Sequence, residues 1–365
     1  MKETFNVGLV GYGFASKTFH APLIAATPGL TLAAVSSRDA DKVHADLPHV
    51  EVDATPQALF ARRDIDLVVI PTPNETHFPL AKAALAAGKH VVIDKPFTVT
   101  LSEGRLLRGQ AEEADKLLSV FHNRRWDSDF LTVRELLAAG TLGRLVHFES
   151  HFDRFRPEVR DRWREQPKPG GGIWYDLGPH LLDQARMLFG MPRSILLDLH
   201  TRRDGAQVDD DFHALLEYDG LRVALHGAAL VAAESPRFTL HGTRGSYVKY
   251  GLDPQEERLK AGEAPAPQGG EEKWGEDSRH GTLTLREYEA EDAPLVAHEH
   301  ATLPGDYLAY YAGIRDALLG DGNVPVAVDD ALAVMQLLEA GLDSVRQRRW
   351  VLIKDGATGR RALHS

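Results

Sequence analysis

The sequence predicts an α/β protein of two domains. The first is a doubly wound parallel sheet, and the second is an α+β domain with a large, open and mostly antiparallel sheet. In the first third of the chain, apolar runs of strand length alternate with helical segments. Two of these runs, DLVVIPT and HVVIDKP, are apolar on both faces, as in a sheet covered on both sides. After about residue 123 strands dominate, and several alternate apolar with polar residues. We therefore expect domains at 1–122 and 123–365.

Composition limits the classes of function. The chain has 365 residues, a formal net charge of −11 and no cysteine. The acidic balance does not favour nucleic-acid binding, and the lack of cysteine excludes disulfides and fits a reducing compartment. The N-terminus has no signal-peptide pattern, and no apolar run reaches the roughly 20 residues of a membrane span. A cytoplasmic protein that binds neither nucleic acid nor membrane is expected.

The first domain is predicted as an alternating series of strands and helices. The strands are expected at 5–11, 30–37, 65–72, 89–96 and 116–122. The helices between them are expected at Lys17–Ala26, Ala40–Asp46, Pro56–Ala61, Glu75–Ala87 and Ser102–Ala114.

The second domain is predicted to have one sheet face on helices and the other open for a partner subunit. Strands are expected at 144–152, 194–202, 212–220, 221–230, 237–250 and 283–291. Helices are expected at Phe130–Ala139, Pro179–Phe189, Tyr307–Leu319 and Asp330–Arg346. The polar, Gly- and Pro-rich segment Gly251–Gly281 is interpreted as a surface excursion near a site or an interface, or as a mobile insertion.

The stretch GLVGYGFAS, at the end of the first strand, indicates a nucleotide-binding loop. Gly11 would permit the tight turn, and Gly13 would let the backbone approach a pyrophosphate. A third glycine is replaced by Ser16, which is a sterically mild change. A bare structural turn is the alternative, but a loop between strand and helix at the start of a βαβ series favours a dinucleotide.

The end of the second strand bears on the choice of cofactor. NAD-binding domains usually carry an acidic residue there, about 20 residues beyond the loop. Here the place is taken by Ser36, Ser37 and Arg38, which suit a 2′-phosphate, so NADP is favoured over NAD. In the alternative, Arg38 is solvated and Asp39 or Asp41 serves the ribose.

Two further stretches carry chemical residues. VVIDKPFTVT places Lys95 just beyond the carboxyl end of an apolar strand, where open α/β sheets bind ligands. GGGIWYDLGPHLLD places Asp176 and His180 four residues apart near the start of a helix, with Pro179 in its expected first turn. The alternatives are a surface lysine, and an Asp176 N-cap with His180 as an ordinary polar residue.

The stretches GLVGYGFASKTFHAPL, PTPNETHFPLAKAALAAGKHVVIDKP and GGGIWYDLGPHLLD together resemble the Gfo/Idh/MocA oxidoreductases over essentially the whole chain. More narrowly, SVFHNRRWDSDFLT, HFDRFRPEVRDRWRE and GSYVKYGLDPQEERL resemble the YdgJ-type branch, which is close to NADP-dependent scyllo-inositol dehydrogenases. The resemblance implies an N-terminal Rossmann domain and a C-terminal domain whose open sheet often forms dimers or tetramers. It also implies oxidation of a secondary hydroxyl on a sugar or cyclic polyol.

The resemblance implies catalytic roles for Lys95, Asp176 and His180, with Asp94 where the family usually has glutamate. The implied cofactor contacts are Gly11, Gly13, Phe14, Ala15, Thr72, Pro73, Asn74 and His77, beside Asp94 and Lys95, and the second strand adds Ser36, Ser37 and Arg38. Expected substrate-binding residues are Asn123, Arg124, Arg162, Trp163 and Asp176. Domain packing and ion pairs are the alternative for the first four of these.

These features together predict an NADP-preferring dehydrogenase that is probed best with polyols. Rival hypotheses are a non-catalytic NADP-binding sensor, an NAD-dependent glycoside hydrolase on the same fold, and a reductase of a keto-sugar or imine. No group of His, Asp and Glu residues has metal-ligand spacing, and His298–His300 is interpreted as a solvated patch. No metal is expected.

Overall fold

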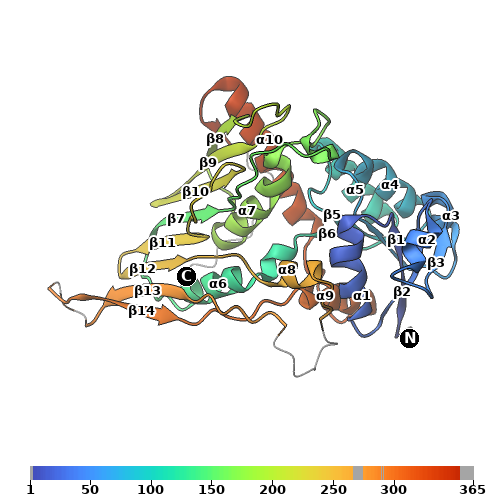
Figure 1. Ribbon diagram of the computed structural model, residues 1–365, viewed down its shortest axis with the longest axis horizontal. Coiled ribbons are helices and arrows are strands. Elements are labelled where there is room, and N and C mark those ends of the chain that lie inside the picture. Colours follow the sequence, from blue (N-terminus) through green and yellow to red (C-terminus); the bar gives the residue numbers. More distant parts are fainter. Residues whose placement is uncertain (1–2, 266–273, 289, 291, 354–365) are drawn as a thin grey trace. The chain divides into compact units, whose positions relative to one another are not determined.

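The computed structural model describes residues 3–265, 274–288, 290 and 292–353. The chain forms two compact units (Figure 1). Each unit consists of several separate segments, so the two units do not correspond to two domains that meet at a single boundary in the sequence. Of the described residues, the first unit takes those up to Trp126, those from Pro254 to Trp274 and those from Asp306 to Met335. The second unit takes the remainder. The described residues of 254–274 and the segment 306–335 thus belong to the first unit, although they are remote from it in the chain.

The first unit contains a six-stranded sheet in the order β3-β2-β1-β4-β5-β6, with every pair parallel. Its strands are β1 (Phe5–Val10), β2 (Leu30–Ser36), β3 (Glu51–Asp53), β4 (Leu67–Ile70), β5 (His90–Asp94) and β6 (Leu118–Phe121). All four residues of β4 are buried, as the doubly apolar run predicts. Because the strand order reverses between β1 and β4, the carboxyl ends of these strands border the crevice where such sheets bind ligands.

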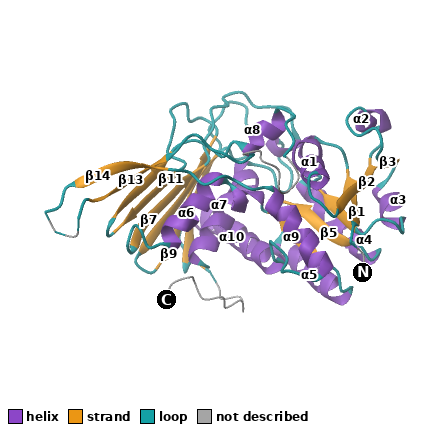
Figure 2. Ribbon diagram, turned by 90° about the horizontal axis from the view of Figure 1, so that it is seen from below, coloured by secondary structure: helices purple, strands orange, loops and turns teal. Residues whose placement is uncertain are grey.

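Helices follow most strands and cover both faces of this sheet (Figure 2). They are α1 (Ala21–Ala25), preceded by a π-helical turn (Ser16–His20), α2 (Ala40–His44), α3 (Pro56–Ala61), α4 (Asn74–Ala86) and α5 (Leu101–Glu113). The predicted helices lie within two residues of these bounds. The doubly wound fold is therefore confirmed.

Two later helices complete the first unit, α8 (Gln255–Lys260) and α9 (Leu308–Leu319). The Tyr310 hydroxyl on α9 donates to Ser119 Oγ on β6 at 3.0 Å, and Ser119 Oγ donates to the Val326 carbonyl at 2.9 Å. In α8, Gln255 and Leu259 are buried. The prediction of 251–281 as an irregular excursion is therefore wrong for its first part, while residues 266–273 lie outside the described residues.

The second unit contains a nine-stranded sheet in the order β14-β13-β12-β11-β7-β10-β9-β8-β15. Its strands are β7 (Leu145–His151), β8 (Ser194–His200), β9 (Asp211–Tyr218), β10 (Leu221–Ala228), β11 (Phe238–Gly242), β12 (Gly245–Lys249), β13 (Gly281–Arg286), β14 (Leu295–His300) and β15 (Val351–Leu352). Only the β7–β10 pair is parallel, so the prediction of a mostly antiparallel sheet is confirmed.

Helices α6 (Ser128–Ala138) and α7 (Ile173–Phe189), with the later part of α10 (Val328–Gln347), lie on one face of this sheet (Figure 2). Trp174 is fully buried there, edge-on to Phe212 at 5.0 Å, and its indole nitrogen donates to the Leu338 carbonyl at 3.1 Å. The other face carries half-buried polar side chains, among them His147, Glu149, His151, His213 and His226.

Sequence periodicity missed three strands and misplaced one helix start. Strand β3 has three residues, β15 has two, and β14 is a largely exposed edge strand with a polar sequence. The run 237–250 is a hairpin rather than one strand. Helix α7 begins at Ile173, six residues before the predicted Pro179, so this proline lies inside the helix.

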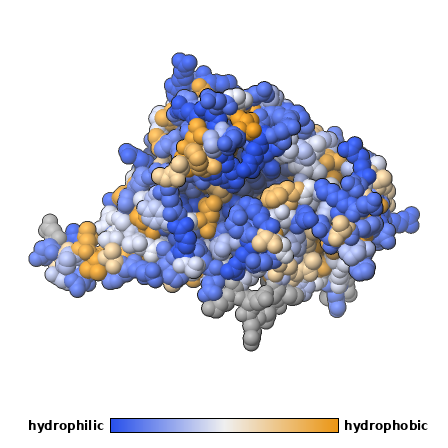
Figure 3. All heavy atoms as spheres, in the orientation of Figure 1, coloured by the Kyte–Doolittle hydropathy of each residue, from blue (hydrophilic) through white to orange (hydrophobic). Residues whose placement is uncertain are grey.

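Polar and charged residues cover most of the molecular face in Figure 3, and apolar side chains occur there in small groups. Among the described residues, no helix combines the length and the apolar character that crossing a membrane requires.

Candidate active site

The glycine loop follows β1 and has the backbone that a dinucleotide requires. Gly11 has φ +80°, which favours glycine, and its N–H donates to the Ser36 carbonyl at 2.8 Å. A Cβ at Gly13 would meet no atom within 4 Å, so the space above this residue is open. Ser16 is buried, and its hydroxyl donates to the Gly11 carbonyl at 2.9 Å. This hydroxyl therefore closes the turn, and the loop leaves room for a pyrophosphate at Gly13.

Arg38 and Asp39, which follow β2, have different surroundings. Asp39 is the N-cap of α2 and accepts from the Lys42 N–H at 3.0 Å, while its own N–H donates to Ser37 Oγ at 3.1 Å. Arg38 is exposed, and no hydrogen bond or ion pair of its side chain occurs within the described part of the chain. Asp39 is therefore engaged in a local cap, whereas the Arg38 guanidinium is available to a ligand.

His77 ties together two loops at the carboxyl edge of the sheet. It is fully buried on α4, with Nε2 at 2.8 Å from the Thr72 carbonyl and Nδ1 at 2.9 Å from the Pro96 carbonyl. Burial lowers the pKa of His77, although the nearby Asp94 charge opposes this effect. Thr72 and the Lys95–Pro96 peptide, which is cis, are thereby held side by side, with Pro73 and Asn74 beginning α4.

Lys95 directly follows β5 and is largely buried, with 9% of its surface exposed. Its backbone N–H donates to Asp94 Oδ1 at 2.8 Å. The other oxygen, Asp94 Oδ2, lies 3.9 Å from His20 Nε2, and His20 Nδ1 lies 2.6 Å from the Tyr311 hydroxyl. The Asp94 carboxylate is thus anchored on the Lys95 backbone and lies near His20, at the end of the π-helical turn that precedes α1.

The electrostatics of Asp94 keep it ionised. Burial alone raises its pKa, but the interaction with His20 and the nearby Lys95 and His77 charges outweigh burial and lower the pKa of Asp94 to about 2. His20 was quoted within the sequence motif but received no role there. Its signal is a histidine four positions after Ser16, the buried serine of the glycine loop.

The segment Asn123–Trp126 forms a short 3-10 helix at the end of the first unit's sheet. Asn123 and Arg124 are both buried. Arg124 forms an ion pair with Glu256 of α8, and its Nη1 lies 3.4 Å from the Tyr307 hydroxyl. The ion pair weighed as the alternative for Arg124 is therefore present, and it joins α8 to the first unit.

The second unit supplies Asp176 and His180 from α7. The helix begins after Gly172, whose φ is +90° and whose added Cβ would lie 2.1 Å from Asp209 Oδ1. Asp209 Oδ2 accepts from the Trp174 N–H at 2.7 Å, so a residue 35 positions away caps this helix. Asp176 therefore lies inside the helix and is not its N-cap, which explains why the start predicted at Pro179 was wrong.

Asp176 and His180 lie one turn apart on α7. Asp176 Oδ1 forms an ion pair with Arg164 Nε at 3.3 Å, and Arg164 also lies over the Trp163 ring at 4.6 Å. Arg162 Nε donates to Glu165 Oε1 at 2.8 Å. His180 is buried, with its ring stacked near Phe152 at 6.4 Å. Arg162, Arg164 and Asp176 therefore lie near one another beside the start of α7, and His180 follows Asp176 by one turn of that helix.

Burial raises the pKa of Asp209 to about 6, and the neighbouring Asp210 charge adds to this effect. In the unfolded chain, an aspartate carboxyl ionises near pH 4. The stabilisation that the protonated Asp209 gives to the folded state is therefore complete below pH 4, and it is lost as the pH rises to about 6. Asp209→Asn keeps an acceptor for Trp174 but cannot ionise. Between pH 4 and 6.5, we expect the free energy of unfolding of the variant, measured with heat and urea, to rise by about 3 kcal/mol relative to that of the wild type. Parallel pH profiles would contradict this.

A histidine–carboxylate cluster lies on the opposite face of the sheet. The carboxylate of Asp153 lies 2.9 Å from His151 Nδ1 and 2.7 Å from His226 Nδ1. The other ring nitrogen of His151, Nε2, lies 2.8 Å from Glu149 Oε1. Burial opposes the charged form of His151, but the two carboxylates outweigh it and raise the pKa of His151. His151, Asp153 and His226 are close enough to surround a cation. The sequence prediction found no such group because His226 is remote in the chain.

The fold and the loop define a dinucleotide-binding oxidoreductase. Two family models match the chain: the NAD-binding Rossmann fold of the oxidoreductase family at residues 5–122, and the C-terminal alpha/beta domain of the same family at residues 134–353. The chain belongs to the Gfo/Idh/MocA family of oxidoreductases.

Individual relatives extend over nearly the full length. The chain is 62% identical over 348 residues to the uncharacterized oxidoreductase YdgJ of Escherichia coli, covering 95% of this chain and 98% of YdgJ. It is 35% identical over 357 residues to the scyllo-inositol 2-dehydrogenase (NADP(+)) IolW of Bacillus subtilis, covering 96% and 97%. A solved oxidoreductase from Yersinia pestis superimposes with a TM-score of 0.91 at 59% identity, covering 98% and 99%.

Proposed function

We propose that the protein is an NADP-preferring dehydrogenase that oxidises a secondary hydroxyl of a cyclic polyol or sugar, scyllo-inositol or a similar compound. The observation that carries the proposal is Lys95, a largely buried lysine just beyond β5, at the edge of the sheet that also bears the glycine loop. The name of the relative IolW supports both the substrate class and the cofactor.

The side chains would divide the chemistry among them. His180 takes the proton of the substrate hydroxyl as general base, and Lys95 hydrogen-bonds the reacting oxygen and stabilises its developing charge. Asp176, fixed by its ion pair with Arg164, orients the hydroxyl, His180 or both. The bound cofactor supplies the hydride acceptor. Asn123, Arg124, Arg162 and Trp163 stay candidates for binding substrate hydroxyls.

The residues of the first unit fit a dinucleotide. The open space at Gly13 would accommodate a pyrophosphate, with Phe14 and Ala15 beside it, and Ser36, Ser37 and Arg38 would lie at the ribose. Thr72, Pro73, Asn74 and His77 would face the nicotinamide side together with Asp94 and Lys95. Arg38 carries the NADP preference, because the competing carboxylate, Asp39, already caps α2.

Arg38→Ala is expected to weaken NADPH binding by about 10- to 100-fold and to change NADH binding less than threefold, since a charged hydrogen bond to the 2′-phosphate is lost. Fluorescence titration of both reduced cofactors measures this. Arg63→Ala removes an equal charge from an exposed position before β4, at the opposite edge of the sheet, and serves as the control. Equal weakening of both cofactors would rule out the 2′-phosphate contact.

We also propose that the polar face of the nine-stranded sheet forms a homo-dimer or tetramer contact. The support is that this face carries half-buried histidines and carboxylates on adjacent strands, as described for His147, Glu149 and His151. Sedimentation of the protein at several concentrations gives the oligomeric state, and His151→Glu should shift it toward the monomer. A monomeric wild type would remove this proposal.

The proposed activity is tested by nicotinamide absorbance with a panel of inositols and aldoses, run in parallel with NADP and NAD. Growth of the reduced-cofactor signal with a polyol, faster with NADP, is the expected result. A faster reaction with NAD would reverse the cofactor assignment. No signal across the panel from protein that binds cofactor would favour a keto-substrate reductase, a sensor or a glycoside hydrolase. Release of a free sugar from a glycoside with a tightly held cofactor would identify the last.

A further inference from the structure

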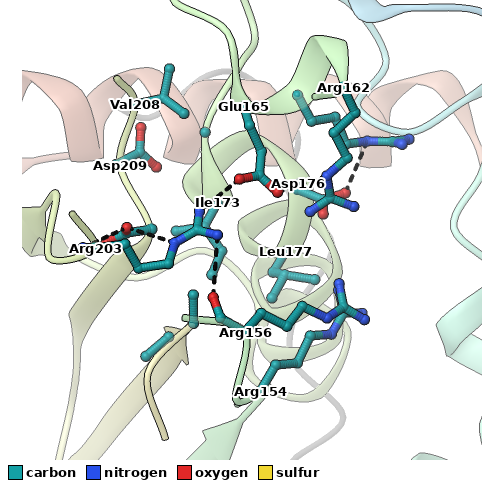
Figure 4. A pocket seen from close by; sticks show the side chains of 15 residues that line it. Arg154, Arg156, Arg162, Glu165, Ile173, Asp176, Leu177, Arg203, Val208 and Asp209 are labelled. Atoms are coloured by element: carbon teal, nitrogen blue, oxygen red, sulfur yellow. Dashed lines mark hydrogen bonds and ion pairs between the residues drawn. The ribbon is translucent and has the colours of Figure 1, made fainter. Parts of the chain in front are cut away.

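A small pocket in the second unit lies beside the first turns of α7 (Figure 4). Asp176 forms part of its wall, so the pocket adjoins the residue proposed to orient the substrate. Five arginines line it, namely Arg154, Arg156, Arg162, Arg164 and Arg203. The carboxylates in its lining are Glu165, Asp176, Asp209 and Asp210. Such a concentration of guanidinium groups beside a catalytic aspartate raises the question of what balances their charge.

Three of the arginines are matched by these carboxylates. Arg203 pairs with Asp210 at 2.9 Å and with Glu165 at 3.0 Å. Glu165 also accepts from Arg162 at 2.8 Å. Two carboxylates thus balance two arginines.

The remaining two carboxylates are also engaged. Asp176 pairs with Arg164 at 3.3 Å. Asp209 faces the backbone at the start of α7 and accepts from the Trp174 N–H, and burial raises the pKa of Asp209 to about 6. Each of the four carboxylates of the pocket wall is thus engaged.

Arg154 and Arg156 are the two remaining arginines of the lining. For Arg156, whose guanidinium is half-buried, no carboxylate lies at ion-pair distance within the described part of the chain. Its backbone is fixed, because its N–H donates to the Ala229 carbonyl at 2.7 Å and its carbonyl accepts from Arg203 Nη1 at 3.3 Å. Figure 4 shows the Arg154 and Arg156 side chains running side by side, with their guanidinium groups at the same end.

This arrangement is electrostatically unfavourable in the protein alone. Burial, together with the charges of Arg154, Arg160 and Arg162, lowers the pKa of Arg156 to about 10, although the Asp176 charge opposes this shift. Parallel guanidinium groups repel each other unless an anion lies between or beside them. The fixed backbone prevents the segment from relaxing, so the pocket keeps a positive potential that is suited to an anion.

The pocket is also small. Its volume of about 40 Å³ has room for roughly three water-sized groups. That suits a carboxylate or phosphate group but not a whole sugar ring. Guanidinium forks match the planar oxygens of a carboxylate and the oxygens of a phosphate through paired hydrogen bonds.

We propose that this pocket binds an anionic group, a carboxylate or a phosphate, carried by the sugar or polyol substrate, and that Arg156 is its principal ligand. The inference rests on the proposed function and narrows its substrate class from neutral polyols to sugar acids or sugar phosphates. Arg154 stands beside Arg156 as a second donor, with its guanidinium over the Phe152 ring at 5.0 Å. Binding energy gained at the anionic group would fix the ring against Asp176 and so favour hydride transfer.

The test compares ligands that differ only in the anionic group. Titration calorimetry on the full-length protein with bound NADPH would use glucose, glucuronate and glucose 6-phosphate, and myo-inositol with its 1-phosphate. We expect at least one anion to bind tenfold or more tightly than its neutral counterpart. Glucuronate and the phosphates distinguish a carboxylate from a phosphate as the bound group.

Three variants connect this preference to the pocket. Arg156→Ala should weaken the preferred anion by about 10- to 100-fold and leave the neutral counterpart nearly unchanged. Arg156→Lys should recover part of the affinity, because the charge returns without the fork. Arg202→Ala removes an equal charge from an exposed neighbour of the pocket and should change neither affinity.

Two outcomes overturn the inference. One is that no anion binds more tightly than its neutral counterpart. The other is that Arg156→Ala and Arg202→Ala weaken the anion equally. Parallel turnover assays separate this failure from failure of the proposed function. Neutral polyols oxidised without an anion preference would leave the dehydrogenase and remove the anion pocket, whereas Arg156-dependent anion binding without any hydride transfer would do the reverse.

Discussion

Lys95→Ala is expected to lower kcat by about 10²- to 10³-fold and to leave cofactor affinity nearly unchanged. The lysine ammonium is proposed to stabilise negative charge on the reacting oxygen, and its largely buried position strengthens that interaction. The substitution spares the local backbone, because the Asp94 carboxylate accepts from the residue 95 N–H whatever the side chain. Steady-state turnover with the best substrate of the polyol panel measures the effect on kcat.

The matched control is Lys82→Ala, which removes the same group from an exposed position on α4 and should leave kcat unchanged. Fluorescence titration with NADPH shows whether the Lys95 variant still folds and binds cofactor. A kcat within twofold of the wild type, in protein that binds cofactor normally, would remove Lys95 from the mechanism. A loss of cofactor binding instead would assign it a positioning role.

The fold of the first unit was predictable because its signals are local. Fully apolar strands such as Leu67–Ile70 require helices on both faces, and several helices of this unit have their own start signal. Thr55 and Thr100, for example, cap the helices that follow them. Hydrophobic periodicity and capping chemistry therefore agree, and such agreement between levels makes an element readable from sequence.

The return of residues 254–265 to the first unit was not predictable. Its anchor is a set of long-range contacts, in which Glu256 pairs with Arg124 and Gln255 accepts from the Tyr307 N–H at 2.8 Å. Nothing in the local pattern marks these partners. A polar, Gly- and Pro-rich composition is compatible both with a solvated loop and with a segment that packs against the first unit.

The candidate site divides in the same way. Lys95 and the glycine loop could be placed at the ends of strands from sequence, because that position is a local property. The start of α7 was missed because its cap comes from Asp209, 35 residues beyond Trp174, and a local search finds only Asp176 and Pro179. The Arg156 pocket was likewise missed, since counting arginines in HFDRFRPEVRDRWRE does not show which of them has a carboxylate partner.

His180→Asn is expected to reduce kcat by about 10²- to 10⁴-fold, the usual size of a general-base contribution. Asparagine keeps a hydrogen-bonding side chain of similar size against Phe152 but cannot take a proton. The variant should also lose the fall in kcat/KM on the acidic side that a histidine base produces. Measuring kcat/KM across the pH range in which the wild type folds distinguishes this role from simple packing.

Packing alone gives a different pattern. A histidine that only fills space near Phe152 would, when replaced, lower thermal stability and scale the whole pH profile without changing its shape. His298→Asn, at an exposed position on β14, controls for the loss of a histidine and should leave rate and profile intact. If the His180 variant retains the acidic limb, the base lies elsewhere. Asp176, one turn earlier on α7 and held by Arg164, is then the group to substitute.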